Sequence, residues 1–136
     1  SKILAVIKHK FRRKSADSLI TAPCRIGNDR FSFAIDTGAS HTVIDLTPLL
    51  IAGYEISDAI GGVELETGKG PIEAHIFEIR SLTVFGITRT DIQVCVYDFL
   101  ANQVLSEFDG VLGLDFFTNE TICIDFDASE ITVTTK

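Results

Sequence analysis

Short apolar stretches that alternate with polar or small residues, each ended by a turn sequence, constrain the fold of this 136-residue chain more than any other feature. Residues 31–35 alternate Phe and Ile with Ser and Ala, which is the two-residue period of a strand with one buried face. Gly27-Asn28-Asp29 just before them has the composition of a hairpin turn. Residues 18–26 and 30–35 are therefore expected to pair as two strands.

Further β-rich runs follow, separated by turn sequences such as Phe85-Gly86 and Asp127-Ala128-Ser129. They cover residues 71–79, 82–85, 91–97, 121–126 and 130–135. Many short strands with turns at close intervals predict a mainly β protein, built as a closed or orthogonally packed barrel.

Helix signals are few. Thr47-Pro48 supplies an N-cap and a first turn, and Gly53 is a plausible stop. A second, shorter helical turn is expected from Gly113 to Phe117. The sequence thus predicts one or two short helices beside the strands.

Size and composition favour one packed domain, because 46% of the residues are hydrophobic and the chain is too short for two ordinary domains. No apolar run approaches the ~20 residues of a membrane-spanning helix, so a soluble chain is expected. Cys24, Cys95 and Cys123 are odd in number and lie in apolar contexts, which favours buried reduced thiols and a cytoplasmic location.

The net charge of −7 argues against a nucleic-acid partner. One basic run, from Lys8 to Lys14, is the exception, and we expect it to form a solvated loop or arm. The chain is accordingly divided into a basic N-terminal arm, residues 1–17, and a domain of residues 18–136.

Asp36 is the most distinctive candidate for chemistry. It follows the apolar strand directly, and the small residues after it, Thr37-Gly38-Ala39-Ser40, allow a tight turn. A carboxylate presented at the end of an apolar strand needs hydrogen-bond donors, and Thr37, Ser40 and the Gly38 N–H are close enough in sequence to supply them. An Asx-turn, in which Asp36 only caps the bend, explains the tripeptide equally well.

Asp36-Thr37-Gly38-Ala39-Ser40 resembles the active-site signature of retropepsin-like aspartic proteases, including their bacterial members. The segment Gly110–Phe117 resembles their second signature, in which two apolar residues and a Gly, here Val111, Leu112 and Gly113, pack behind the catalytic loop. Between the two signatures, Leu65–Pro71 stands where such proteins carry a flap, with Thr67, Gly68, Lys69 and Gly70 as its tip. The order of these three motifs over residues 18–135 makes the resemblance specific.

This resemblance implies a retropepsin-like closed β-barrel, the half-lobe of an acid protease, that acts as a homodimer. One Asp-Thr-Gly per chain means that two Asp36 carboxyls must meet, share a proton and activate water to hydrolyse peptide bonds of an extended polypeptide. No cofactor and no metal are implied. In the family the Thr bonds across the two-fold axis and the Gly backbone holds the carboxylates, roles that would fall to Thr37 and Gly38.

Some alternatives stay open at this stage. Gly61-Gly62 also has the composition of a flap tip, although the β-rich residues 71–79 favour Gly68. Viral members carry an Arg where this chain has Leu114, so the dimer contacts made by that Arg are not expected here. A non-catalytic peptide-binding or dimerisation module with the same fold is the alternative function.

Two other sequence features, a Ser-His pair and three histidines, do not indicate a catalytic or metal site. Ser40 and His41 are consecutive, so they point to opposite faces of an extended segment and cannot easily form a nucleophile–base pair. His9, His41 and His75 are too widely spaced for a zinc site, and no pair of cysteines lies two residues apart to complete one.

Overall fold

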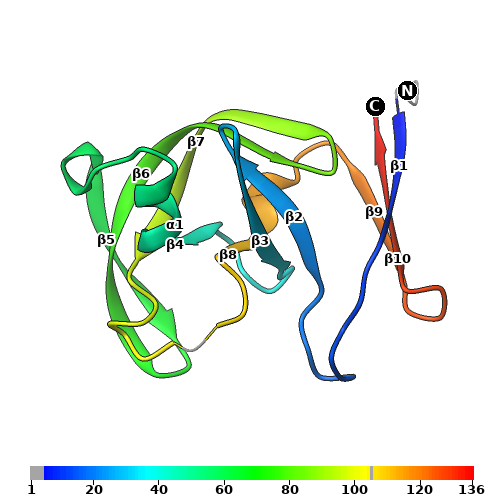
Figure 1. The fold of residues 1–136 in the computed structure, drawn as a ribbon, viewed down its shortest axis with the longest axis horizontal. Coiled ribbons are helices and arrows are strands. Elements are labelled where there is room, and N and C mark those ends of the chain that lie inside the picture. The colour runs from blue at the N-terminus through cyan, green and yellow to red at the C-terminus, as the bar shows by residue number, and fades with distance from the viewer. Residues whose placement is uncertain (1–4, 105) are drawn as a thin grey trace.

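Strands account for most of the chain in the computed structural model, which describes residues 5–104 and 106–136 (Figure 1). The strands are β1 Ala5–Lys10, β2 Thr21–Ile26, β3 Asp29–Ile35, β4 Val43–Asp45, β5 Gly61–Thr67, β6 Gly70–Val84, β7 Ile87–Tyr97, β8 Gly110–Leu112, β9 Thr121–Asp125 and β10 Glu130–Thr135. One α-helix, α1 Leu46–Ile51, and two 3₁₀ turns, η1 Ile56–Asp58 and η2 Leu114–Phe116, interrupt them. The prediction of a mainly β protein with short helices is confirmed.

A closed barrel forms the body of the molecule. Its strands follow the order β2-β3-β8-β4-β7-β6, and a further pairing of β2 with β6 closes the ring. β5 extends the sheet from the outer side of β6. The predicted pairing of residues 18–26 with 30–35 is present as the antiparallel β2–β3 hairpin.

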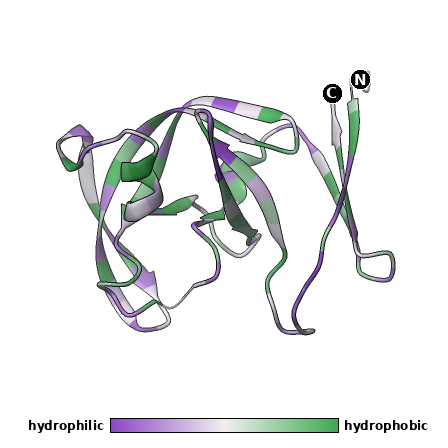
Figure 2. Cartoon of the chain, viewed as in Figure 1, coloured by the Kyte–Doolittle hydropathy of each residue, from purple (hydrophilic) through white to green (hydrophobic). Residues whose placement is uncertain are grey.

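The interior of the barrel is apolar, and hydrophobic and hydrophilic residues alternate along its strands (Figure 2). In β2, for example, Ala22, Cys24 and Ile26 are buried while Pro23 and Arg25 are exposed. This alternation follows from the pleat, which sends successive side chains to opposite faces. The largest fully buried side chains include Phe33, Phe77, Phe116, Ile44, Leu49 and Leu112.

Residues 5–10, expected in a solvated basic arm, instead form strand β1. This strand pairs antiparallel with β10, and β10 pairs with β9, so that a three-stranded sheet joins the two ends of the chain (Figure 1). Ile7 packs partly buried against the core. The expectation of a loop or arm is wrong for residues 5–10, because their partner strand lies at the far end of the sequence, whereas residues 11–14 do lie in a loop. The division into an arm and a domain at residue 17 stays a prediction.

Several element boundaries also differ from those predicted. Residues 71–79 and 82–84 lie in one strand, β6, because the pairing with β7 resumes at Ser81. Arg80 between them has no partner on β7, and its N–H donates to the Tyr54 hydroxyl at 3.0 Å. Helix α1 begins two residues earlier than expected, with Asp45 rather than Thr47 at the N-cap position. β4 and β8 were not predicted, since three residues carry no usable periodicity.

The three cysteines differ in their surroundings. Cys24 and Cys95 are buried, as predicted, and burial raises the pKa of the Cys24 thiol to about 12. Cys123 is exposed, which corrects the expectation of a buried thiol. It lies on β9 of the terminal sheet, where alternate residues face solvent.

Glu120 ties the segment after η2 to the barrel. Arg89 of β7 donates from Nη2 to the Glu120 carboxylate and from Nε to the Phe116 carbonyl, the latter at 2.7 Å. Burial acts to raise the pKa of Glu120, but hydrogen bonds from Arg89 and from the Thr118 and Asn119 N–H groups outweigh it. The pKa of this carboxyl therefore lies below its ordinary value of 4.5.

A carboxyl whose pKa is lower in the folded chain than in the unfolded chain stabilises the fold at any pH above the pKa of the unfolded chain. This stabilisation is lost as the pH falls through the pKa of the folded chain. Glu120→Gln should lower the free energy of unfolding at neutral pH by about 1–2 kcal/mol, because it weakens a charge-assisted hydrogen bond. Urea titrations of both proteins at neutral pH and near pH 3 would measure the effect. The difference in the free energy of unfolding between wild type and Glu120→Gln should be smaller near pH 3 than at neutral pH. An equal difference at both pH values would contradict this account.

Candidate functional site

The loop after β3 holds Asp36 at the mouth of the barrel. β3 runs parallel to β8, with Ile35 opposite Leu112, and the Asp36 N–H donates to the Leu112 carbonyl at 3.1 Å. The Asp36 Oδ1 accepts a hydrogen bond from the Gly38 N–H at 2.9 Å, and its carbonyl accepts one from the Ala39 N–H at 3.1 Å. The half-buried carboxylate is thus fixed at the strand end while remaining accessible to solvent.

Of the three expected donors, one forms a hydrogen bond with the Asp36 carboxylate in the structure. Gly38 donates to the carboxylate, whereas Thr37 and Ser40 are exposed and make no side-chain hydrogen bond to it in the described part of the chain. The carboxylate is therefore held by a backbone N–H, and the two side-chain hydroxyls that were also expected to donate to it do not.

Gly113 supports this loop from behind, directly after β8. A Cβ at this position would lie 2.6 Å from the His41 carbonyl carbon and 2.9 Å from the Ala39 oxygen, so the backbones touch here. The next residue, Leu114, donates its N–H to the Ala39 carbonyl at 2.9 Å. The apolar-apolar-Gly motif is placed behind the Asp36 loop, and Gly is needed because no side chain fits between the two segments.

Thr42 and Asp115 form a polar network between the same two segments. The Thr42 hydroxyl donates to Asp115 Oδ1 at 2.7 Å and accepts from the Gly113 N–H at 3.2 Å. The Thr42 N–H also reaches both oxygens of Asp115, at 2.9 and 3.0 Å. Because Thr42 is fully buried, this network fixes the spacing between the Asp36 loop and η2.

Thr42 could not be predicted as a site residue, since a lone Thr beside an apolar strand carries no distinctive sequence pattern. Asp115 lies within the Gly110–Phe117 segment, but no role was predicted for it. The sequence feature that indicates this network is the acid itself. A carboxylate between apolar residues, as in Leu114-Asp115-Phe116, needs hydrogen-bond donors when the segment is buried.

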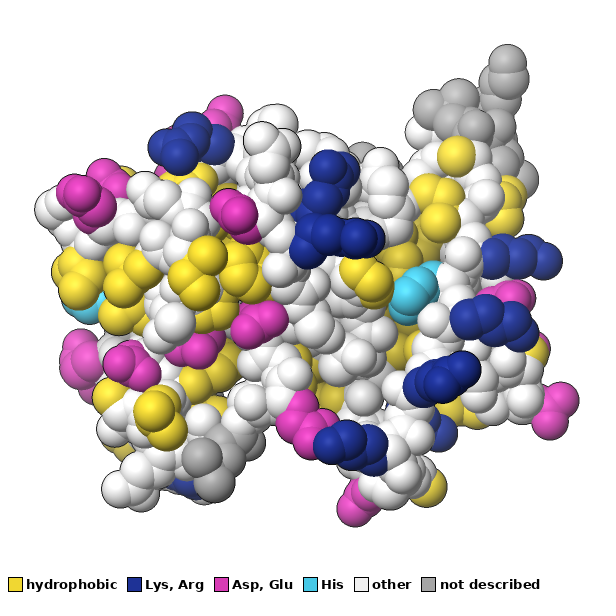
Figure 3. All heavy atoms as spheres, in the orientation of Figure 1, with side chains coloured by type: hydrophobic (Ala, Val, Ile, Leu, Met, Phe, Trp, Pro, Cys, Tyr) yellow, Lys and Arg dark blue, Asp and Glu magenta, His cyan; other side chains and the backbone are white. Residues whose placement is uncertain are grey.

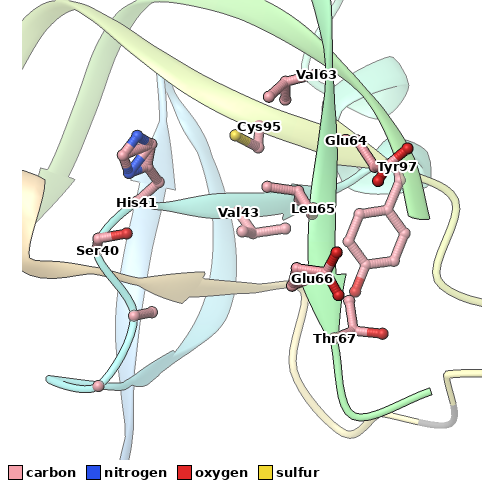
Figure 4. Close-up of a pocket in the computed structure, with 12 residues that line it drawn as sticks. Ser40, His41, Val43, Val63, Glu64, Leu65, Glu66, Thr67, Cys95 and Tyr97 are labelled. Atoms are coloured by element: carbon pink, nitrogen blue, oxygen red, sulfur yellow. The ribbon is translucent and has the colours of Figure 1, made fainter. Parts of the chain in front are cut away.

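A pocket of about 420 Å³ opens beside the loop (Figure 4). Residues 38–41 form one wall and residues 63–67 of β5 form the other, with side chains of β4 and β7 between them. Figure 4 shows Leu65 directed from β5 toward Val43. The full lining is Gly38, Ala39, Ser40, His41, Val43, Val63, Glu64, Leu65, Glu66, Thr67, Cys95 and Tyr97.

Two ionisable groups in this pocket have pKa values above their ordinary ones. Burial, aided by the negative charge of Asp115, raises the pKa of the Cys95 thiol. Burial, aided by Asp45, likewise raises the pKa of the Tyr97 phenol. Cys95 and Tyr97 are therefore uncharged at neutral pH, and the acidic side chains of Glu64 and Glu66 also line the pocket.

The β5–β6 hairpin covers one side of this pocket, and its turn lies at Gly68-Lys69. Thr67 pairs with Gly70, the Thr67 hydroxyl donates to the Gly70 carbonyl at 2.7 Å, and the Lys69 N–H donates to the Thr67 hydroxyl at 3.2 Å. Gly61-Gly62, the alternative tip, lies within β5 and pairs with β6. The hairpin tip is thus at Gly68, as predicted, and not at Gly61-Gly62.

Comparison with known proteins decides the family. A family model described as aspartyl protease matches residues 22–116, which include the Asp36 loop, the hairpin and the segment from Gly110 to Phe116. The chain belongs to the aspartyl protease family. A crystal structure described as a retropepsin-like aspartic protease from Rickettsia conorii matches with a TM-score of 0.71 and 18% identity, over 99% of this chain and 96% of the other. A search of curated proteins found no match.

The fold of this protease is therefore retropepsin-like, as the motifs predicted. Among residues 5–104 and 106–136, no group of three His, Cys, Asp or Glu side chains is placed to hold a metal ion. None of the helices in those ranges is long and apolar enough to cross a membrane. Leu114, which stands where viral relatives carry an Arg, is half-exposed.

Replacing Thr42 with Val should destabilise the protease by about 1–3 kcal/mol, because it removes the hydroxyl that donates to Asp115 Oδ1 and leaves the Gly113 N–H without its acceptor. The backbone N–H of residue 42 would still donate to Asp115. Denaturant unfolding would measure the loss. Thr90→Val is the matched control, since Thr90 is an exposed strand residue, and it should be near neutral. Equal losses in the two variants would show that the network contributes nothing specific.

Proposed function

We propose that this chain is an endopeptidase that works as a homodimer, with one Asp36 from each copy forming the catalytic pair. The observation that carries the proposal is the Asp36 carboxylate, held at the end of β3 by the Gly38 N–H beside a pocket of about 420 Å³. A single carboxylate cannot both activate water and protonate a leaving amide. One Asp-Thr-Gly per chain therefore calls for a second copy.

In such a pair, two carboxyls within hydrogen-bond reach share one proton, because like charges that close cannot both ionise. The ionised Asp36 takes a proton from water, whose oxygen attacks the scissile carbonyl carbon. The protonated Asp36 donates a hydrogen bond to the carbonyl oxygen. Collapse of the tetrahedral species breaks the C–N bond, and a proton passes to the departing nitrogen.

The neighbouring residues position this pair rather than react. The Gly38 N–H holds Asp36 Oδ1, and Thr37 is exposed at the loop, from which it would reach its counterpart across the two-fold axis. Ala39 and Ser40 continue the loop along the pocket wall. Val111 and Leu112 lie behind the loop through the β3–β8 pairing, and Gly113 lies there through its close approach to the His41 and Ala39 backbone.

The substrate is an extended polypeptide lying between the loop and the β5–β6 hairpin. A strand-like peptide would satisfy exposed backbone groups there, and alternate side chains would enter the pocket. The hairpin tip, Thr67 to Gly70, would act as the flap. Lys69 Nζ donates to the Gln103 carbonyl, so the tip is fastened to a loop of its own chain and must release that contact to open.

The decisive experiment incubates the purified chain with an unfolded protein in mildly acidic buffer, at concentrations for which sedimentation velocity gives the oligomeric state. Cleavage that rises with the dimer fraction supports the proposal. A stable dimer that binds peptides but leaves them intact would identify the non-catalytic module instead. The expected cytoplasmic location stays a prediction.

A further inference from the structure

Four polar side chains form one row across the outer face of the barrel. Arg30 of β3 lies directly opposite Arg25 of β2, Arg25 lies opposite Thr83 of β6, and Thr83 lies opposite Thr88 of β7. The hydroxyls of Thr83 and Thr88 are 2.8 Å apart. Residues directly opposite on neighbouring strands carry their Cβ atoms about 5 Å apart, so the two guanidinium groups are close neighbours.

No acidic side chain compensates the charge of this pair of arginines. Arg89 bonds Glu120, whereas Arg25 and Arg30 take part in no ion pair or side-chain hydrogen bond within the described ranges. Like charges placed directly opposite on a sheet repel each other. An anion bound between the two would remove that repulsion.

A hollow of about 140 Å³ lies at these arginines, and no acidic residue lines it. Its lining is Pro23, Arg25, Arg30, Thr83, Val84, Phe85 and Gly86. Figure 3, drawn in the orientation of Figure 1, shows Lys and Arg side chains gathered over β2 and β1, while Asp and Glu side chains are more numerous over the β5 side. The face is locally basic although the chain carries a net charge of −7.

The wall of the hollow is rigid and continuous with the terminal sheet. Phe85 and Gly86 both have positive φ, 53° and 72°, in the tight turn that joins β6 to β7. The Phe85 ring packs edge-on against His9 of β1 at 5.5 Å. The site is therefore preformed rather than dependent on a flexible loop.

We propose that this hollow is a binding site for a phosphate group. Each guanidinium has a planar set of N–H donors. Two guanidinium groups together can bond more acceptor oxygens, and neutralise more negative charge, than a single carboxylate provides. A tetrahedral dianion has oxygens for both arginines and for the Thr83 hydroxyl. Arg30 precedes Asp36 by six residues along β3, about 20 Å at strand spacing, so the site is separate from the proposed catalytic pair.

The test is an NMR titration of the full chain with inorganic phosphate at low ionic strength, followed through the amides of β2, β3 and the β6–β7 turn. Saturable shifts confined to those segments, with a dissociation constant of about 1 mM or tighter, are expected. Arg25→Gln/Arg30→Gln should weaken binding at least about tenfold. Arg12→Gln/Lys136→Gln makes the same change of net charge at other exposed positions and should leave the affinity unchanged.

Two further arms complete the test. Acetate should bind at least about tenfold more weakly than phosphate if two guanidinium groups are engaged. A phosphoserine peptide that binds more tightly than inorganic phosphate would identify the source as a phosphorylated protein, and equal affinity would identify free phosphate. Shifts that do not saturate, or that persist unchanged in Arg25→Gln/Arg30→Gln, would overturn the proposal. Both residues are exposed, so the variant is expected to fold, and its circular dichroism would verify this.

Discussion

Asp36→Asn is expected to lower kcat/KM for cleavage of an unfolded polypeptide by about a thousandfold or more, because neither copy of the dimer could then act as general base. The substitution should leave the fold intact. The side-chain oxygen that accepts the Gly38 N–H is retained, and the backbone bonds to Leu112 and from Ala39 are unaffected. Rates measured on a fluorogenic peptide or casein, with thermal melts of both proteins, would test the prediction.

A matched control separates the chemistry of Asp36 from a general effect of losing a carboxylate. Asp58 in η1 also accepts a backbone hydrogen bond, from the Glu55 N–H at 2.8 Å, and it does not line the pocket. Asp58→Asn should therefore keep full activity. Cleavage by Asp36→Asn at the wild-type rate would refute the assignment of Asp36.

Mixing the two proteins tests whether the site is shared between copies. If both Asp36 residues are required, wild-type chains that have exchanged with an equal amount of Asp36→Asn chains should lose about half of their activity, since half of them then sit in mixed dimers. Chains that act alone would lose none. This result would distinguish a shared site from a complete site in each chain.

Gly113→Ala is expected to cause the largest loss of stability among single substitutions around the site. The added methyl group would lie 2.6 Å and 2.7 Å from the carbon and oxygen of the His41 carbonyl and 2.9 Å from the Ala39 oxygen, all of them backbone atoms. Backbone cannot rotate away as a side chain can, so β8 and the Asp36 loop must separate. We expect a loss of about 3 kcal/mol or more in the free energy of unfolding.

Activity should fall along with stability in this variant, because the loop that holds Asp36 is the segment displaced. Gly68→Ala is the control: a Cβ there meets nothing within 4 Å, so the same chemical change should be close to neutral in a denaturant melt. Gly113→Ala with wild-type stability would show that the two segments are not packed as described.

Motifs with local chemistry could be predicted from the sequence. Asp36 after an apolar strand, the Gly-rich hairpin tip at Gly68 and the turn at Phe85-Gly86 each depend on a few consecutive residues, and each lies where it was expected. The Gly38 N–H as the partner of Asp36 was foreseen for the same reason. Family membership followed from the order of such motifs along the chain.

Features that join distant segments could not be predicted. β1 was assigned to a solvated arm because its lysines suggest exposure, and its partner β10 lies more than a hundred residues away. The bonds of Thr42 with Asp115, and the row formed by Arg30, Arg25 and Thr83, depend on strand register, which no short window of sequence contains.

A barrel of short strands carrying one Asp-Thr-Gly loop could be predicted from the residues alone, because alternation and turn chemistry are local properties. The residues that pack behind and around that loop depend on the folding of the whole chain. The contact of Gly113 with His41, the Thr42–Asp115 network and the pocket between the loop and β5 arise when β8 inserts between β3 and β4. Those contacts are set by packing of the whole barrel, which forms cooperatively and leaves no trace in any one segment.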